Sequence, residues 1–504
     1  MSTPVPGVLT GPRMPDSRAP IDEFDVAVRL ETQGVTDEVA HALYGYGSTM
    51  RMAVAEFPRM ASEASGLRVP APSESWLKAF LHGASYAVPM FISALAIALQ
   101  GFSLWGGDLE GETASAVAVG VVASFILAGG FVQGLALRMS FYLGIGEHSS
   151  AVKVAGLWSG AGMLFLCSAS AVFLAVNTLF RWMPFSLGVT SAGFAISLGA
   201  LFLASAALYV LEMRLAVAGA TLAGLAVTTV CVRILDQPVL PGQFLGIWTA
   251  TGAAVAAAWS RLGPLCRQST TTIRTFTVAR ETLIAWASAA AGVLYYLLLF
   301  SDRMIAWTAG TQAALLPVMF RGDYETAVGL AMILFVLGAG WVHASTAAFR
   351  HWAQDSRTVA SAAEPWRLNQ NAGRRLLGGI PLFLPLPVLG AVAIYYTAQS
   401  LDLLSSPEME RVLVVALTAY PLLVIGLWGR SILEMLNLVH HGLLPAAAAV
   451  LADLVIGYVL TRTGTYSLAI YSFLCGSAVF AAGMILAARR ACRQFDHHYF
   501  AAHL

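Results

Sequence analysis

The feature that most constrains this chain is a series of apolar runs of about twenty residues between Leu81 and Ala487. A helix needs roughly that length to cross the hydrocarbon core of a bilayer, which is about 30 Å thick. Hydrophobic side chains make up 58% of the 504 residues and charged side chains only 11%, whereas soluble domains average about 25% charged residues. The chain is therefore predicted to be an all-α integral membrane protein with about twelve transmembrane helices in a lipid bilayer.

The predicted spans form two sets of six. The first set covers residues 82–105, 114–138, 151–177, 185–210, 213–233 and 240–259. The second set covers residues 282–302, 325–349, 376–400, 411–429, 440–461 and 466–488. We therefore expect the following parts: a first six-helix bundle over 81–259, a basic cytoplasmic linker over 260–281, a second six-helix bundle over 282–488 and a cytoplasmic C-terminal tail over 489–504.

Residues 1–80 are predicted to form a short cytoplasmic extension. Its first part, Met1–Pro20, is rich in proline and polar residues and is expected to be a flexible tail. Helical patterns follow over Ile21–Thr32 and Thr36–Met60, and the second begins with Thr36 as a candidate N-cap. No apolar signal segment precedes Pro70, so the N-terminus is expected in the cytoplasm, where these two helices would recruit a protein partner.

The distribution of Lys and Arg predicts the orientation, because positive residues are retained on the cytoplasmic side during insertion. With both termini inside, 23 of the 29 Lys and Arg residues lie inside. The six assigned to external loops are Arg181, Arg233, Arg303, Arg321, Arg411 and Arg462. The chain is predicted to be a multi-pass protein of the bacterial inner membrane with both termini in the cytoplasm.

Composition and motifs exclude several classes of function. A net charge of +1 without a clustered basic surface argues against a nucleic-acid partner. The five cysteines have no CxxC spacing, and the His440–His441 and His497–His498 pairs lack a recognisable metal geometry. No P-loop, dinucleotide-binding glycine motif, HExxH or GxSxG is present. We expect no catalytic residue, no metal site and no cofactor apart from Na⁺ or H⁺ as a coupling ion.

Two sets of six helices around a basic loop are typical of transporters whose substrate site lies between two repeated bundles. Receptors and membrane enzymes also have many helices, so the architecture by itself leaves these classes open. Interrupted helices often mark the substrate site. One candidate is the ninth span, with Pro381, Pro385 and Pro387. The other is the second span, where Gly129 and Gly130 precede Gln133 and Arg138; better packing at a kink is the alternative interpretation for both.

Ionisable side chains inside the hydrocarbon region are costly and are therefore functional candidates. Asp453 lies well inside the eleventh span, where its carboxylate would bind Na⁺ or carry a proton; the alternative is a structural hydrogen bond. His343 in the eighth span is a candidate proton relay or a packing residue. Arg430 and Glu434 lie four residues apart, on one helix face, and they form either an inner gate or a solvated surface pair.

Asp302, Arg303 and Trp307 lie at the predicted outer end of the seventh span. Opposite charges beside an aromatic side chain suggest contact with an anionic or sugar substrate at the outer mouth. The alternative is an anchor at the membrane interface.

The stretch LYYLLLFSDRMIAW, followed by FRGDYETAVGLAMI, resembles the seventh and eighth helices of the Pel-type exopolysaccharide transporters. These belong to the flippase superfamily that includes the multidrug and toxin extrusion (MATE) carriers. Asp302, Arg303 and Trp307 match the family's pattern, Asp323 and Tyr324 match it loosely, and the N-terminal extension departs from it. GGFVQGLALRMSFYLG and the C-terminal RRACRQFDHHYF are also similar to family segments.

The resemblance implies two bundles that work by alternating access. It also implies export or flipping of an exopolysaccharide or a lipid-linked sugar, with a cytoplasmic glycosyltransferase as partner. Two alternatives stay open. One is a cation-coupled antiporter of drugs or metabolites with the same fold, in which Asp453 is the coupling residue. The other is a membrane scaffold or transferase in a polysaccharide synthesis complex.

Overall fold

The computed structural model describes residues 23–32, 34–66, 75–107, 109, 111–268, 277–310, 317–359 and 365–503. The predicted tail Met1–Pro20 lies outside these residues, as do residues 269–276 of the predicted linker. The chain divides into two compact units. The smaller unit holds the N-terminal helices with residues 351–363, and the larger unit holds the remainder from Trp76 onward.

The N-terminal helices are α1 (Glu23–Thr32), α2 (Asp37–Tyr44) and α3 (Thr49–Gly66). Thr36 is the predicted N-cap, and its side chain accepts a hydrogen bond from the Val39 amide. The prediction of one helix over Thr36–Met60 is wrong, because Gly45 adopts the left-handed conformation (φ 75°) and ends α2. A small apolar core holds the three helices together, and it includes Val26, Leu30, Val35, Ala40 and Met52.

The predicted number of spans is confirmed: the described residues contain twelve helices that are long and apolar enough to cross a membrane. The first six spans comprise α4 (Trp76–Ala84) with the 3₁₀ turn η1 (Ser85–Ala87) and α5 (Val88–Gln100), α6 (Gly111–Gly144), α7 (His148–Phe180), α8 (Phe185–Val210), α9 (Arg214–Thr229) with the π turn η2 (Val230–Ile234), and α10 (Val239–Gln268). We call these helices the first bundle.

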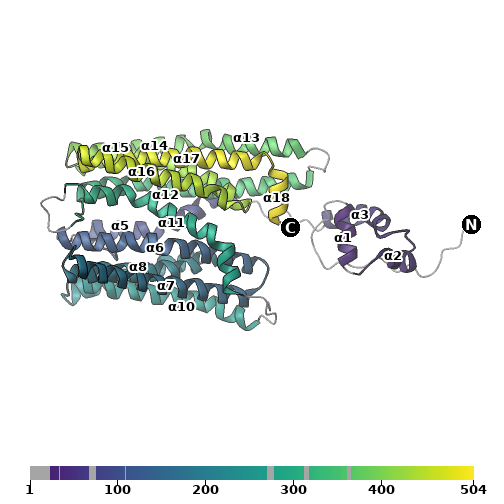
Figure 1. The fold of residues 1–504 in the computed structure, drawn as a ribbon, viewed down its shortest axis with the longest axis horizontal. Helices are drawn as coiled ribbons and strands as arrows, with labels where there is room; N and C mark the ends of the chain where they lie inside the picture. The colour runs from purple at the N-terminus through teal and green to yellow at the C-terminus, as the bar shows by residue number, and fades with distance from the viewer. Residues whose placement is uncertain are drawn as a thin grey trace, which may run out of the picture. The chain divides into compact units, whose positions relative to one another are not determined.

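The second bundle holds the other six spans. They comprise α11 (Val278–Thr308), α12 (Gly322–Val359), α13 (Pro365–Phe383) with α14 (Pro385–Ser400), α15 (Pro407–Met435), the 3₁₀ turn η3 (Val439–Gly442) with α16 (Leu443–Thr463), and the 3₁₀ turn η4 (Tyr466–Leu468) with α17 (Ala469–Cys492). The last helix, α18 (Phe495–His503), follows the twelfth span. No β-strand occurs in the described part of the chain. Figure 1 shows α7, α8 and α10 along one side of the helical array and α13 to α17 along the other.

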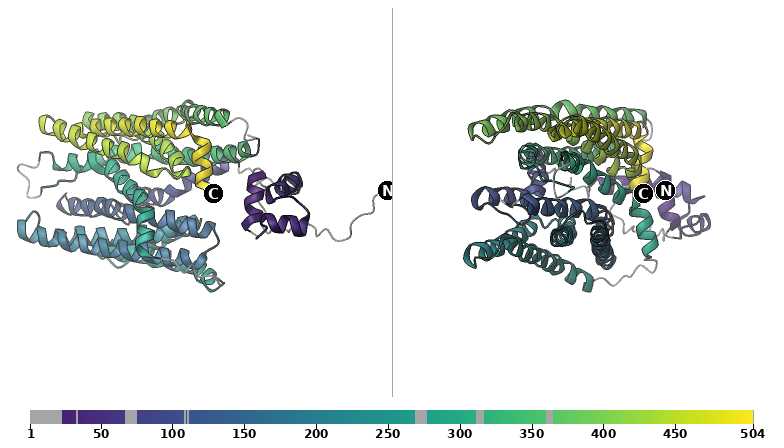
Figure 2. Two further views of the ribbon diagram at one scale, coloured as in Figure 1. Left: turned by 45° about the vertical axis from the view of Figure 1, so that its right-hand side comes forward. Right: turned by 60° about the vertical axis from the view of Figure 1, so that its left-hand side comes forward.

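The two bundles pack in matching ways. In the first bundle, α9 contacts both α5 and α10, and α8 contacts α10. In the second bundle, α16 contacts both α11 and α17, and α15 contacts α17. In each bundle these helices belong to the first, fourth, fifth and sixth spans. The matching contacts indicate a structural repeat of the kind found in transporters. Figure 2 shows the two groups of helices from two further directions.

Helix α6 of the first bundle and α11 of the second pack against each other along much of their length, and they run antiparallel. Phe125 of α6 lies beside Phe300 of α11, with ring centroids 5.2 Å apart, while Arg138 near the other end of α6 contacts Glu281 near the start of α11. Between these levels, Gly292 lies against the backbone of Gly129. This line of contacts joins the two bundles, and we call it the α6–α11 seam.

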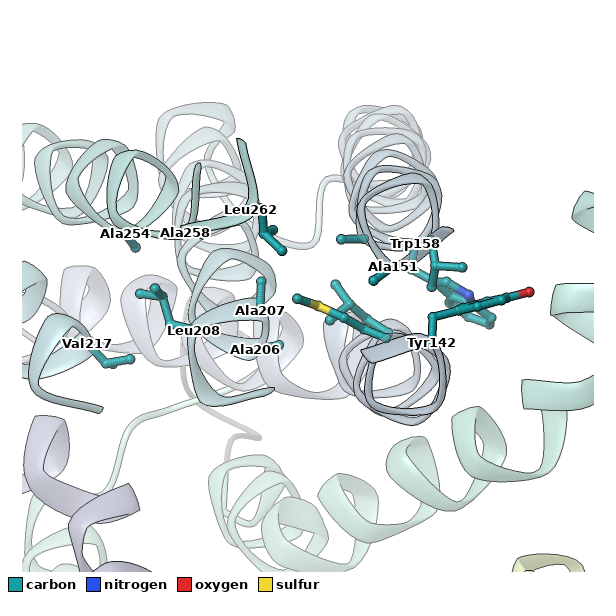
Figure 3. Packing of buried hydrophobic residues seen from close by; sticks show 14 of the residues in the cluster. Tyr142, Ala151, Trp158, Ala206, Ala207, Leu208, Val217, Ala254, Ala258 and Leu262 are labelled. Carbon is teal, nitrogen blue, oxygen red and sulfur yellow. The ribbon is translucent and has the colours of Figure 1, made fainter. Parts of the chain in front are cut away.

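The interior of the larger unit holds many alanines and serines beside aromatic and aliphatic side chains, while other aliphatic side chains such as Leu179 and Leu215 are exposed. Small residues allow helices to approach closely in a bilayer, where lipid already solvates leucine. One cluster, mostly from the first bundle, packs Tyr142 and Trp158 among alanines such as Ala151 and Ala206. Figure 3 shows this cluster, with the Tyr142 hydroxyl at its edge and pointing away from it.

The two predicted helix interruptions have different outcomes. The ninth span is divided at Leu384, between α13 and α14, where three prolines remove backbone donors. Hydrogen bonds still continue from the Leu384 amide to the Ile380 carbonyl and from the Val388 amide to the Leu384 carbonyl. The second span is unbroken over Gly111–Gly144, so of the two interpretations of its glycines the interruption is wrong. Those glycines serve close packing in the α6–α11 seam.

Candidate functional site

A cavity of about 520 Å³ lies between α5 and α6 of the first bundle and α11 and α12 of the second. Its walls are mostly apolar and include Phe91, Val121, Phe300 and Ile333. The lining residues come from α5 and the loop that follows it, the start of α6, the end of α11 and the start of α12. All these ends lie on the side of the membrane predicted to be external. The cavity thus lies at one end of the interface between the bundles.

Three side chains form the ionic patch of the cavity wall: Arg303, Trp307 and Glu325. Arg303 Nη1 donates to Glu325 Oε2 at 3.1 Å, and Trp307 Nε1 donates to Glu325 Oε1 at 3.0 Å. Arg303 Nη2 lies 3.4 Å from the Tyr420 hydroxyl, which accepts from it. The side chains of Arg303 and Glu325 are only 10% and 14% exposed. The interpretation of Arg303 and Trp307 as an interface anchor is therefore wrong, because both lie inside the protein.

Two carboxylates are buried behind the ionic patch, and both are linked to one dipeptide of α11. Asp302 is 1% exposed and accepts a hydrogen bond from the Tyr324 hydroxyl at 2.6 Å. Asp453 of α16 is fully buried and accepts a hydrogen bond from Ser301, the residue that precedes Asp302. Among the described residues, Oδ1 of each carboxylate has no hydrogen-bond partner. A buried carboxylate oxygen without a donor is costly, so each Oδ1 is a natural acceptor for a proton or a cation.

Arg138 and Gln133 lie away from the cavity, toward the other end of α6. Arg138 donates from Nε to Glu281 Oε2 at 2.6 Å and from Nη2 to Glu281 Oε1 at 3.2 Å. Gln133 lies beside Gly292 in the middle of the α6–α11 seam. Neither residue lines the cavity. The structure therefore separates these two predicted pathway residues from Asp302, Arg303 and Trp307.

His343 also lies away from the cavity. Its ring centroid is 5.3 Å from that of His82 and 6.1 Å from that of Tyr86. The predicted pair of Arg430 and Glu434 forms within α15, with Nε and Oε1 2.7 Å apart. The Arg430 side chain is 10% exposed rather than solvated. Because both members belong to one helix, this pair does not join the two bundles.

Sequence reasoning missed Glu281 and the role of Glu325. Both stand within four residues of the start of a helix, where a glutamate is usually a solvated charge that favours the helix N-terminus. One signal could have identified Glu325, because it follows Asp323 and Tyr324 in a segment that resembles a known transporter family. For Glu281 no such signal exists, because its partner Arg138 is far away in the sequence. Within the described residues, no group of three His, Cys, Asp or Glu side chains is arranged to hold a metal ion.

The architecture has counterparts among solved structures. A MATE structure in the straight conformation superposes with a TM-score of 0.57 and 15% identity, covering 85% of this chain and 99% of the other. An outward-facing multidrug resistance MATE transporter of the MOP superfamily gives a TM-score of 0.56, also at 15% identity, with coverage of 85% and 99%. This chain has the MATE fold.

A MOP superfamily transporter from Pyrococcus furiosus shares the same fold, with a TM-score of 0.54, 14% identity and coverage of 84% and 99%. No protein-family model and no curated protein matches the sequence. The predicted fold class, a twelve-helix MATE-like architecture of two bundles, is confirmed. In terms of this fold, the cavity and its ionic patch lie between the two bundles, and the carboxylates Asp302 and Asp453 lie within the second bundle.

Proposed function

We propose that this chain is a membrane transporter that moves an amphipathic molecule by alternating access and is driven by H⁺ or Na⁺. The observation that carries the proposal is the cavity between the bundles, which combines apolar walls with a single ionic patch. Ligand sites typically pair an apolar lining with a few polar groups that fix orientation. The apolar walls suit the apolar body of a substrate, and the patch of Arg303, Trp307 and Glu325 suits its polar group.

A free polysaccharide suits this cavity less well. Each sugar hydroxyl taken out of water needs a hydrogen-bond partner, because an unpaired buried polar group costs about 1–3 kcal/mol. Most of the lining residues are aliphatic or aromatic and offer no such partner. A lipid-linked sugar is amphipathic and remains a second candidate. It is favoured by the position of Arg303 and Trp307 in the cavity wall, with Asp302 buried behind them, since these residues carry the resemblance to exopolysaccharide transporters.

The two buried carboxylates support the coupling to a cation. Asp302 and Asp453 are both almost inaccessible, yet each has one oxygen without a partner among the described residues. Both are linked to the α11 segment that also carries Arg303 into the cavity. A proton or Na⁺ that binds here would change the charge next to the ionic patch. This arrangement gives a physical route by which cation binding alters substrate binding.

The test is transport by the purified full-length chain in vesicles under an imposed pH or Na⁺ gradient. Two probes separate the candidates: the fluorescent amphipathic cation ethidium and a fluorescent lipid-linked oligosaccharide. Gly329 lines the cavity, and a Cβ there meets open space, so Gly329→Trp fills the cavity without a backbone clash. Gly160→Trp on α7 is the matched control, because it also meets open space but does not line the cavity.

We expect gradient-driven movement of one probe, loss of that movement in Gly329→Trp, and retention in Gly160→Trp. Movement of ethidium favours the antiporter, and flipping of the oligosaccharide favours the lipid-linked sugar. If neither probe moves, or if the cavity variant transports as well as the control, the proposed function is wrong.

A further inference from the structure

We infer that Arg138, Tyr142 and Glu281 form the inner gate of this transporter. These ionic contacts must break before the cavity can open to the cytoplasmic side of the membrane. The inference rests on the proposed function for its role in transport. Its geometry stands independently, because these three residues join the two bundles at the end of the seam opposite to the cavity.

The three residues make a closed set of charge-assisted hydrogen bonds. Arg138 uses Nε and Nη2 to donate to both carboxylate oxygens of Glu281, at 2.6 and 3.2 Å. The Tyr142 hydroxyl donates to Glu281 Oε1 at 2.7 Å, and Arg138 Nη2 also lies 3.3 Å from the Tyr142 oxygen. A two-point contact between guanidinium and carboxylate is among the strongest side-chain pairings and is strongly directional.

The pair is buried to a degree that is unusual for two opposite charges from different bundles. The Arg138 side chain is 5% exposed and that of Glu281 is 0% exposed. Apolar packing lies next to the pair, because Tyr142 and Met139 of α6 and Ala285 of α11 belong to one hydrophobic cluster. Arg280 adds a positive charge that acts on Glu281. In Figure 3 the Tyr142 hydroxyl points out of this cluster, and in the structure it reaches Glu281. Removing one partner of such a pair leaves an uncompensated buried charge.

The position of the gate fits alternating access. The last α6 residue that lines the cavity is Val122, and Arg138 lies sixteen residues further along this unbroken helix, a rise of about 24 Å. On α11 the order is reversed, with Glu281 in the first turn and the cavity residues Phe300 and Arg303 near the other end. The gate therefore closes the interface at the side predicted to be cytoplasmic, while the cavity lies at the other side.

The close contact of Gly129 and Gly292 lies between the cavity and the gate along the α6–α11 seam. Backbones that touch at one level can stay together while the two ends of the interface separate in turn. Opening the inner end then requires Arg138 and Glu281 to part and to be rehydrated. As long as the gate is intact, the conformation in which the cavity faces the outside of the membrane is favoured.

The pair of Arg430 and Glu434 provides a matched control. It is also an Arg–Glu ion pair, with a bond of 2.7 Å and a mostly buried arginine, but both residues belong to α15. Its loss removes a similar interaction without releasing one bundle from the other.

The experiment measures the separation of the inner ends by pulsed electron paramagnetic resonance on the purified full-length chain. Spin labels replace Lys153 of α7 and Arg490 of α17, which are exposed residues on the inner ends of the two bundles, and serine replaces the five natural cysteines. Glu281→Gln keeps the shape of the side chain and removes its charge. We expect it to raise the ratio of inner-open to inner-closed molecules by about tenfold or more, since bonds to charged groups are strong.

Two further variants keep the test decisive if Glu281→Gln affects the fold. The exchange Arg138→Glu with Glu281→Arg restores the ion pair in reverse, and we expect it to return the distance distribution toward that of the natural protein. Arg430→Met should leave the distribution unchanged. An unchanged distribution in Glu281→Gln, or an equal shift in Arg430→Met, overturns the inference. No substrate is present in this measurement, so failure of the transport assay leaves its outcome untouched.

Discussion

Replacing Gly292 by alanine tests the close contact between α6 and α11 in the middle of the α6–α11 seam. An added Cβ would lie 2.6 Å from the Gly129 carbonyl oxygen and 2.6 Å from Gln133 Cγ. Ordinary van der Waals contact begins near 3.4 Å, so α6 and α11 must part by about 0.8 Å at this level. One of the two obstacles is backbone and cannot rotate away. The substitution therefore strains the α6–α11 seam itself.

The expected magnitude follows from packing energetics. Extra methyl groups in a well-packed interior cost about 1–3 kcal/mol, and a gap of 0.5–1 Å forfeits about a quarter to a half of the dispersion energy of the separated atoms. The control is Gly160→Ala in α7, where an added Cβ meets nothing within 4 Å. Alanine in a helix is more stable than glycine by about 0.5–1 kcal/mol. Both variants gain this helix term, so we expect them to differ by the packing cost alone, about 1–3 kcal/mol in the free energy of unfolding.

The assay is reversible unfolding of the purified chain in mixed micelles, with rising mole fraction of sodium dodecyl sulfate, followed by circular dichroism. Gly292→Ala should unfold at a lower mole fraction than the natural protein, and Gly160→Ala at an equal or higher one. If both variants unfold together, the two helices do not meet at Gly292 as closely as the structure places them.

Two predictions concern single carboxylates. Asp453→Asn should abolish the gradient dependence of probe transport in vesicles. Ser301→Ala removes one hydrogen-bond donor to Asp453 and should weaken this dependence without abolishing it. Gradient-driven transport by the asparagine variant would leave Asp453 a structural role. In the N-terminal helices, a hydrogen bond from the Thr49 amide holds the pKa of Asp37 below its usual value. This contribution to stability is present above the usual carboxyl pKa and is lost as the pH falls through the lowered one. Hydrogen-exchange protection of α2 and α3 should therefore decline in acid, and Asp37→Asn should remove that part of the decline; an equal decline in both proteins would contradict this account.

Much of the fold was predictable because the bilayer places the same physical requirement on every span. Each span must be apolar and long enough to satisfy its own backbone hydrogen bonds, and this requirement is visible in any twenty-residue window. The same reasoning failed for the helix from Thr36, because only the left-handed conformation at Gly45 ends α2 there. At Gly129 the sequence left unwinding and better packing open, and the structure shows packing against α11.

The candidate site was predictable in its residues more than in its geometry. Asp453 stood out because a carboxylate in an apolar run has no local explanation. Asp302 and Arg303 looked like a pair of opposite charges, yet Asp302 bonds to Tyr324 and Arg303 pairs with Glu325. Adjacent residues on a helix point in different directions, so their partners come from other helices and cannot be identified from their spacing.

The sequence by itself determined that this chain spans a membrane with twelve helices, because hydrophobic length is a local property of each segment. It also determined which charges are costly, since a carboxylate such as Asp453 lies within an apolar run. Only the tertiary structure decided that Arg138 meets Glu281, 143 positions away, and that Arg303 faces a cavity with Glu325 and Trp307. Such pairings depend on how rigid helices from two bundles pack against each other, and that packing is set by contacts between segments that are remote in the sequence.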